Sequence, residues 1–218
     1  MHVLDRSGTI DDGEALGLAR GAPGALAVRD DDAERRGRPT VHVLWGEASA
    51  VLAGDALQSL AFEGLLTDGD PECVARAARD LARAIGPVGL VGGQVDDLRQ
   101  AENPGDEGFV LSIHERKTAA LIQACVVGGA RLASASEDQL VLLSAFGLEV
   151  GVAFQIADDG LDADEDESSC SLVSLIGREA CLERAEQLLE SALSRTEGMG
   201  ERAEPLRALA RFAVRRNA

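Results

Sequence analysis

Tyrosine is absent from this chain, and aromatic residues make up only 3% of it. Strands favour aromatic and β-branched residues, whereas the Ala and Leu that are abundant here favour helices. Sustained alternation of apolar and polar residues, which marks a half-buried strand, is missing as well. The sequence therefore predicts an all-α fold.

Basic residues are scarce: 21 Lys and Arg stand against 38 Asp and Glu, giving a formal net charge of −17. Such a charge excludes nucleic acid and anionic membrane surfaces as favoured partners. A phosphorylated ligand stays compatible with it, because a bound cation inverts the local field.

Cysteine pairs and targeting signals are also missing. The four cysteines are isolated, without C-x-x-C spacing, which argues against a structural zinc site and favours reduced thiols in the cytosol. No basic segment and apolar core of signal-peptide type follow Met1, and no stretch of 18 apolar residues is free of charge. We expect a cytoplasmic protein without a membrane span.

Lysine occurs once, at Lys117, among the 21 basic residues. Its ammonium is a compact point charge on a flexible stem, a good partner for phosphate, whereas arginine brings a planar fork. Lys117 lies in the segment Ile113-His114-Glu115-Arg116-Lys117-Thr118, and this setting makes it a candidate phosphate ligand.

A carboxylate cluster closes a long apolar stretch, in the segment Phe154-Gln155-Ile156-Ala157-Asp158-Asp159-Gly160-Leu161-Asp162. On a helix, Asp158 and Asp162 fall on one face a turn apart, with Asp159 beside them. Mg²⁺ removes the repulsion within such a cluster, because it accepts protein carboxylates together with phosphate oxygens. The alternative is a solvated helix end followed by an acidic loop.

No linker or internal repeat divides the chain, so we expect one domain over residues 1–218. Residues 86–93 are glycine-rich, and we expect Asp96 and Asp97 to fix this turn by capping and hydrogen bonding. Helical periodicity and breakers predict the following helices: Glu14–Ala22, Glu47–Leu66, Pro71–Ile85, Phe109–Ala133, Glu137–Leu161, Gly177–Glu197 and Arg202–Arg216.

Several motifs, taken in order, resemble those of the trans-prenyl diphosphate synthase family, which includes the farnesyl and geranylgeranyl diphosphate synthases. The likeness runs from about Asp30 to Arg216, and residues 1–23 diverge. The motifs that carry it are Arg35-Arg36-Gly37-Arg38-Pro39-Thr40, Gly54-Asp55-Ala56-Leu57, Gly92-Gly93-Gln94-Val95-Asp96-Asp97-Leu98, Lys117-Thr118, and Phe154-Gln155 with Asp158-Asp159-Gly160-Leu161-Asp162.

This resemblance implies an isoprenoid synthase-type helical bundle around a central cavity, usually dimeric. It implies Mg²⁺-dependent prenyl transfer, in which an allylic diphosphate ionises and isopentenyl diphosphate attacks the carbocation. The residues carried over are Lys117 and Arg35 for the allylic diphosphate, Arg36 for isopentenyl diphosphate, Thr118 and Gln155 facing the cavity and the diphosphate, and Asp158, Asp159 and Asp162 for Mg²⁺. Lys117 and Asp158 would be the catalytic pair.

The chain departs from the family at the first aspartate motif, which lies before R-R-G in active synthases. Its leading pair falls here on Gly24 and Ala25, and only its last member remains, as Asp30. Asp30, Asp31 and Glu34 form a nearby D-D-x-x-E, which is either a displaced substitute for the lost metal ligands or a charged, solvated turn.

Two further departures bear on function. The family's N-terminal helices are expected to be missing, because residues 1–23 show nothing like their isopentenyl diphosphate-binding segment. Residues 158–167 hold seven acids and no base, where the family usually places lysines that close over the diphosphate. Three hypotheses follow: a degenerate, modulatory subunit beside an intact synthase, as a homodimer or hetero-oligomer; an active prenyltransferase or terpene-cyclase-like enzyme; or a remnant that keeps only the fold.

Overall fold

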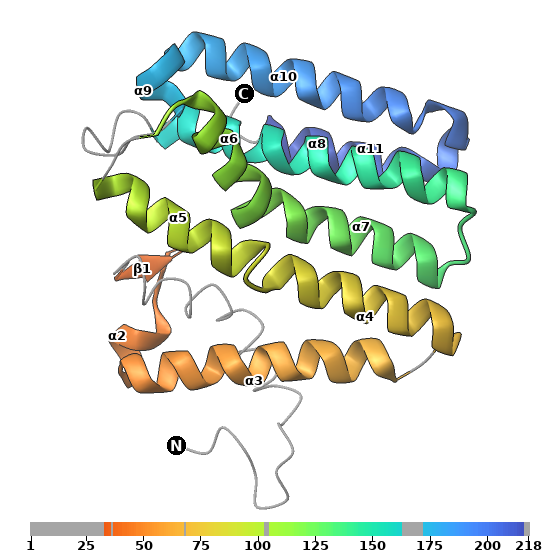
Figure 1. Cartoon of the computed structure of the whole chain (residues 1–218), viewed down its shortest axis with the longest axis horizontal. Coiled ribbons are helices and arrows are strands. Elements are labelled where there is room, and N and C mark those ends of the chain that lie inside the picture. Colours follow the sequence, from red (N-terminus) through yellow and green to blue (C-terminus); the bar gives the residue numbers. More distant parts are fainter. Residues whose placement is uncertain (1–32, 36, 68, 103–104, 163–171, 216–218) are drawn as a thin grey trace, which may run out of the picture. The chain divides into compact units, whose positions relative to one another are not determined.

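The computed structural model describes residues 33–35, 37–67, 69–102, 105–162 and 172–215. Their contacts divide the chain into two compact units, residues 1–67 and 68–218. Each unit is described by itself, and a single domain over the whole chain stays a prediction. The all-α prediction is confirmed (Figure 1), since the strands in the described residues form only one short ribbon.

The described part of the first unit begins with that ribbon, which the sequence did not predict. Strands β1 (Glu34–Arg35) and β2 (Arg38–Pro39) pair antiparallel around Gly37, whose φ of 72° suits a residue without a Cβ. Thr40, which is buried, donates its backbone N–H to the carbonyl of Ala33 over 3.1 Å and thereby closes the ribbon.

Two helices follow the ribbon in the described residues of the first unit. Helix α2 (Val41–Trp45) was not predicted, whereas α3 (Glu47–Leu66) has the predicted bounds. The small residues of this segment predict a buried helix, but this prediction is wrong for the chain taken alone, since Ala50 is the only buried residue on α3. Its small residues match a buried helix by composition, yet Val51 and Leu52 are exposed.

The second unit is a bundle of helices (Figure 1). Helix α4 has its predicted bounds, and Asp70 caps its first turn by accepting from the backbone N–H groups of Glu72 and Cys73. These hydrogen bonds lower the pKa of Asp70. The helices are α4 (Pro71–Ile85), α5 (Leu90–Glu102), α6 (Glu107–His114), the π-helix η1 (Glu115–Ala119), α7 (Ala120–Leu132), α8 (Glu137–Asp162), α9 (Leu172–Ile176), α10 (Arg178–Arg195), the 3₁₀-helix η2 (Glu197–Ala203) and α11 (Glu204–Val214).

Helix α8 is the centre of this bundle. It packs against α7 on one side and α10 on the other, and Phe146 and Ile156 are among its fully buried side chains. By length and composition α8 could cross a membrane, but half of its most apolar stretch is buried against its neighbours, as in the core helix of a globular protein.

Glycines let η1 and α7 approach α8 closely. A Cβ on Gly151 would lie 2.4 Å from the Cα of Ala119, and one on Gly147 would lie 2.8 Å from the Cα of Gln123. Because backbone atoms stand on the other side, no side-chain rotation relieves such a clash. The glycines thus bring the Lys117-Thr118 segment of η1 against the end of α8.

Candidate functional site

The cations of η1 are held by carboxylates of α5. The ammonium of Lys117 lies 2.7 Å from Asp97 Oδ2, and the guanidinium of Arg116 pairs with Asp96. Asp96 and Asp97 lie inside α5, so the prediction that they cap a glycine-rich turn is wrong. They hold the side chains of the neighbouring helix instead.

A close helix contact sets up this pairing. A Cβ on Gly93 would lie 2.4 Å from the backbone nitrogen of Lys117, so only glycine allows α5 to run this near to η1. Arg116 adds hydrogen bonds to the carbonyls of Pro87 (3.2 Å) and Val88 (3.3 Å), which precede α5. The guanidinium is therefore committed to fixing the start of α5.

The π-helix places Thr118 against α8. Thr118 donates its hydroxyl to Gln155 Oε1 over 2.7 Å, and Gln155 donates its Nε2 to Asp159 Oδ1 over 3.2 Å. One extra residue in a helical turn re-aims the side chains around it, and such π-segments are frequent at functional sites. Two motifs that lie far apart in the sequence thus form one hydrogen-bonded row.

Asp159 is the end of this row and is engaged through both oxygens. Its Oδ2 lies 3.1 Å from His114 Nε2 and accepts the backbone N–H of Leu172 over 3.4 Å. His114 is buried, and its Nδ1 has no hydrogen-bond partner in the described part of the chain. Asp159 therefore ties α6 and α9 to α8, and its role as a magnesium ligand stays a prediction.

A buried thiol lies near this carboxylate. Burial raises the pKa of Cys181 to about 11, and the negative charge of Asp159 adds to the rise. The thiol is thus neutral at physiological pH and packs as an apolar side chain of α10.

The other two predicted magnesium ligands lie at the carboxyl end of α8. Asp158 is half-buried there, and Asp162 is the last residue of the helix, one turn further on. Across the described ranges, no group of three or more His, Cys, Asp or Glu side chains is placed to hold a metal. The role of Asp158 and Asp162 as magnesium ligands therefore stays a prediction.

The remaining predicted site residues belong to the first unit. Glu34 and Arg35 lie in β1, whereas Asp30, Asp31 and Arg36 are outside the described residues. Their assignments to diphosphate and to metal stay predictions from the motif.

Sequence reasoning missed four functional side chains: the carboxylates Asp96 and Asp97, the guanidinium of Arg116, and His114. The available signal was the Gly92-Gly93 pair four residues before Asp96 and Asp97, because glycine in a helix interior often marks a close approach by another backbone. Gln94 also lies on α5, buried, with an Oε1 that has no partner within the described residues.

Comparison with known proteins gives the relatives of the chain. It is 38% identical over 208 residues to the dimethylallyltranstransferase of Fischerella ambigua. It is 40% identical over 213 residues to geranylgeranyl pyrophosphate synthase 11, chloroplastic, of Arabidopsis thaliana. Each match covers 88% of this chain and 60% of the relative, so the chain spans about three fifths of their length.

Solved structures that resemble the chain are also named as prenyl diphosphate synthases or geranyltransferases. A farnesyl/geranylfarnesyl diphosphate synthase from Zymomonas mobilis matches with a TM-score of 0.80 at 36% identity, covering 94% of this chain and 78% of that one. A Helicobacter pylori geranyltransferase complexed with magnesium and isoprenyl diphosphate matches with a TM-score of 0.74 at 27% identity, covering 90% and 72%. The polyprenyl synthetase family model matches residues 28–172, and the chain belongs to the polyprenyl synthetase family.

Proposed function

We propose that this chain binds a magnesium-complexed prenyl diphosphate where α5, η1 and α8 meet, and that it acts as a modulatory subunit beside an intact prenyl diphosphate synthase. The observation that carries the proposal is the position of Lys117. Its ammonium is held by Asp97 of α5, and the next residue along the chain, Thr118, begins the row that continues through Gln155 and Asp159 of α8.

Each side chain at this site would have its own role in binding the diphosphate. Lys117 offers a point charge to diphosphate oxygens, and Asp97 keeps that charge in place before the ligand arrives. Thr118 and Gln155 orient each other and fix the side chains around the ligand. Arg35 and Arg36 would add guanidinium contacts, and this part of the proposal rests on the motif alone.

Asp158 and Asp162 would hold Mg²⁺, which when bound neutralises the diphosphate. This neutralisation matters here because residues 158–167 hold seven acids and no base. A diphosphate without a cation would be repelled by them. Binding at this end of the bundle should therefore depend on Mg²⁺.

The modulatory role rests on sequence. Gly24 and Ala25 stand where the leading aspartates of the first motif would be, so that half of the metal clamp lacks its carboxylates. A relative in Arabidopsis thaliana, 38% identical over 215 residues, is the large subunit 1 of a heterodimeric geranylgeranyl pyrophosphate synthase. Assembly with another synthase chain, or as a homodimer, in the cytoplasm is part of the proposal.

A second candidate is an active prenyltransferase or terpene-cyclase-like enzyme. The contacts of Lys117, Thr118 and Gln155 support it as well, since a catalytic site also needs its polar groups held in place before the substrate arrives. Asp30, Asp31 and Glu34 would then replace the missing carboxylates.

The deciding experiment incubates the purified protein with labelled isopentenyl diphosphate, each allylic diphosphate and Mg²⁺, alone and with a prenyl synthase encoded nearby. The modulatory role predicts no product from the protein alone and an altered product length when the synthase is present. Product from the protein alone would establish the second candidate and contradict the first. An unaltered product length would also contradict the modulatory role.

Lys117→Ala tests whether the effect passes through the site. It should abolish the change in product length while the protein stays folded. Arg202→Ala, which removes an exposed arginine of η2, is the matched control and should leave the change intact.

A further inference from the structure

Four arginines gather at the other end of the second unit. Arg76, Arg79 and Arg83 repeat along one face of α4, and Arg131 lies near the end of α7. Together with Asp80 they line a pocket of about 380 Å³. Such a concentration of positive charge stands out in a chain whose net charge is −17.

Among the described residues, the carboxylates nearby pair with only two of these four arginines. Arg76 pairs with Glu72 over 2.5 Å, but Arg131 reaches Asp80 only over 3.6 Å. Across the described residues, Arg79 and Arg83 make no hydrogen bond or ion pair with other side chains or backbone.

Arg131 is the least exposed of the four. Its side chain is 15% exposed, and its Nε is buried without a hydrogen-bond partner in the described residues. A buried guanidinium N–H without an acceptor costs on the order of 1–3 kcal/mol, so the pocket favours a ligand that brings oxygens.

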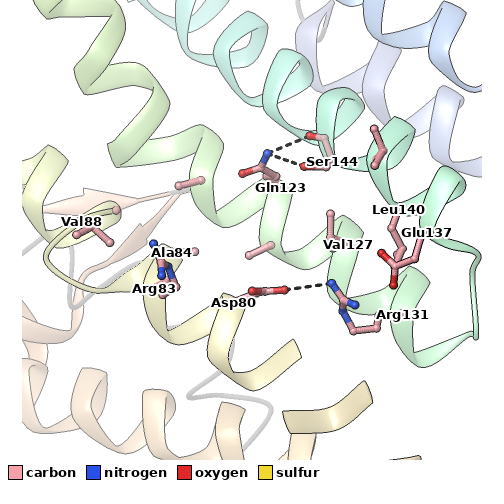
Figure 2. A pocket seen from close by; sticks show the side chains of 14 residues that line it. Asp80, Arg83, Ala84, Val88, Gln123, Val127, Arg131, Glu137, Leu140 and Ser144 are labelled. Carbon is pink, nitrogen blue, oxygen red and sulfur yellow. Dashed lines mark hydrogen bonds and ion pairs between the residues drawn. The ribbon is translucent and has the colours of Figure 1, made fainter. Parts of the chain in front are cut away.

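A second cavity of about 520 Å³ adjoins the first between α4, α7 and α8 (Figure 2). The two share Asp80, Arg83 and Arg131. Figure 2 shows Arg131 facing Asp80 across the cavity, while Gln123 bonds to Ser144 further along α7 and α8. Its other walls include Val127, Leu140 and Val141, so an apolar space continues from the arginines.

We propose that the pocket of Arg76, Arg79, Arg83 and Arg131 is a second binding site, for a diphosphate anion. Guanidinium groups match phosphate oxygens in pairs, and several of them at one place hold an anion without a metal. The adjoining apolar cavity offers room for a hydrocarbon tail, so the diphosphate is either inorganic pyrophosphate or the head of a prenyl diphosphate.

This site is separate from the proposed substrate site. Lys117 and Arg131 are about 21 Å apart along η1 and α7, at 1.5 Å per helical residue. The proposal rests on the arginines alone and does not require the proposed function, because it concerns other residues and needs no Mg²⁺.

Calorimetric titration of the full chain with inorganic pyrophosphate in buffer containing EDTA tests it. We expect saturable binding by the wild-type protein. Arg83→Glu should weaken this binding at least tenfold, whereas Arg202→Glu, with the same change of charge on an exposed arginine, should alter it less than threefold. Arg79→Ala/Arg83→Ala, which introduces no new charge, should also weaken it if Arg83→Glu fails to fold.

Two outcomes would overturn the proposal: no binding in EDTA, or binding that is lost in Lys117→Ala but kept in Arg83→Glu. The second outcome would place the anion at the substrate site and leave the proposed function standing. Farnesyl diphosphate distinguishes the sources: tighter binding than pyrophosphate assigns the site to a prenyl diphosphate, and equal binding assigns it to inorganic pyrophosphate.

Discussion

The two ends of the second unit differ in how their cationic side chains are paired with carboxylates. Where α5 meets η1, Lys117 lies 2.7 Å from Asp97 and Arg116 is paired with Asp96. Where α4 meets the end of α7, Arg131 reaches its carboxylate only over 3.6 Å. The first end pairs its positive charges within the fold, whereas at the second end only Arg76 has a close carboxylate, and Arg79 and Arg83 have no partner among the described residues.

This difference predicts whether each end needs Mg²⁺ to bind an anion. Paired cations are preorganised but nearly neutral, so the α5–η1 end needs the further charge of Mg²⁺ before a diphosphate is held there. Unpaired arginines keep their full charge and need no metal. Titration with pyrophosphate, with and without Mg²⁺, can therefore distinguish binding at one end from binding at the other.

The largest effect is expected when the glycine contact at the paired end is broken. Gly93→Ala places a methyl group 2.4 Å from the backbone nitrogen of Lys117, so η1 must move away from α5. We expect a loss of about 1–3 kcal/mol of unfolding free energy and loss of magnesium-dependent pyrophosphate binding. Chemical denaturation and calorimetry measure the two.

Gly129→Ala is the matched control for that variant. It also lies in a helix, but a Cβ there meets nothing within 4 Å. Since alanine is the better helix former, the control should be neutral or stabilised by up to about 1 kcal/mol. If both variants were destabilised equally, the close contact at Gly93 could not be the cause of the loss of stability.

The next effect is on the paired lysine itself. Lys117→Ala should weaken magnesium-dependent pyrophosphate binding at least tenfold, because the ammonium is the cation that Asp97 holds at this end. Binding in EDTA should be unchanged, since the arginines about 21 Å away are untouched. Calorimetric titration in both buffers measures this, and a loss in both would mean that the two ends are not independent.

A smaller effect is expected at the inner end of the hydrogen-bonded row. His114→Phe removes the ring nitrogen that lies 3.1 Å from Asp159 Oδ2, so the buried carboxylate loses a partner. Because Asp159 keeps Gln155 and the backbone of Leu172 as partners, the expected loss is about 1 kcal/mol of unfolding free energy. A double-mutant cycle with Asp159→Asn measures the coupling, and additive losses would show that the pair does not interact.

The smallest effect concerns paired charges at the surface, far from either pocket. Arg207 and Arg211 lower the pKa of Glu204 through hydrogen bonds, so its carboxylate stays charged in the folded state to lower pH than in the unfolded chain. Its contribution to stability is present above the unfolded pKa near 4.5 and is lost as the pH falls through the folded pKa.

Glu204→Gln should therefore lower thermal stability slightly at pH 7 and make it less dependent on pH below 4.5. Thermal unfolding at pH 7 and pH 3.5 measures both. An unchanged pH dependence would mean that such surface pairs contribute nothing, and that only pairing between helices, as at Lys117 and Asp97, matters.

Much of this architecture could be predicted from the sequence. Periodicity and breakers gave the bounds of α3 and α4 and nearly those of α8, because each is set by a strong local signal. The contacts of α5 could not be predicted. Its partners are set by the approach of a helix that lies about 20 residues further along the chain.

The same limit applies to the candidate site. Lys117, Thr118 and Gln155 were identified by motif; the structure joins Thr118 to Gln155 and pairs Lys117 with Asp97, and their roles stay predictions. The engagement of Asp159 by His114 could not be foreseen, because it depends on how α6 packs against α8. The arginine pocket was also missed, since three of its members lie on one helix and read as an ordinary solvated face.

The most direct test of the central claim is one calorimetric titration of the wild-type protein with inorganic pyrophosphate, run with Mg²⁺ and again with EDTA. The account predicts two binding events with Mg²⁺, one of which disappears in EDTA. Identical isotherms in the two buffers would contradict it, because no diphosphate would then be held through the metal at the end of α8.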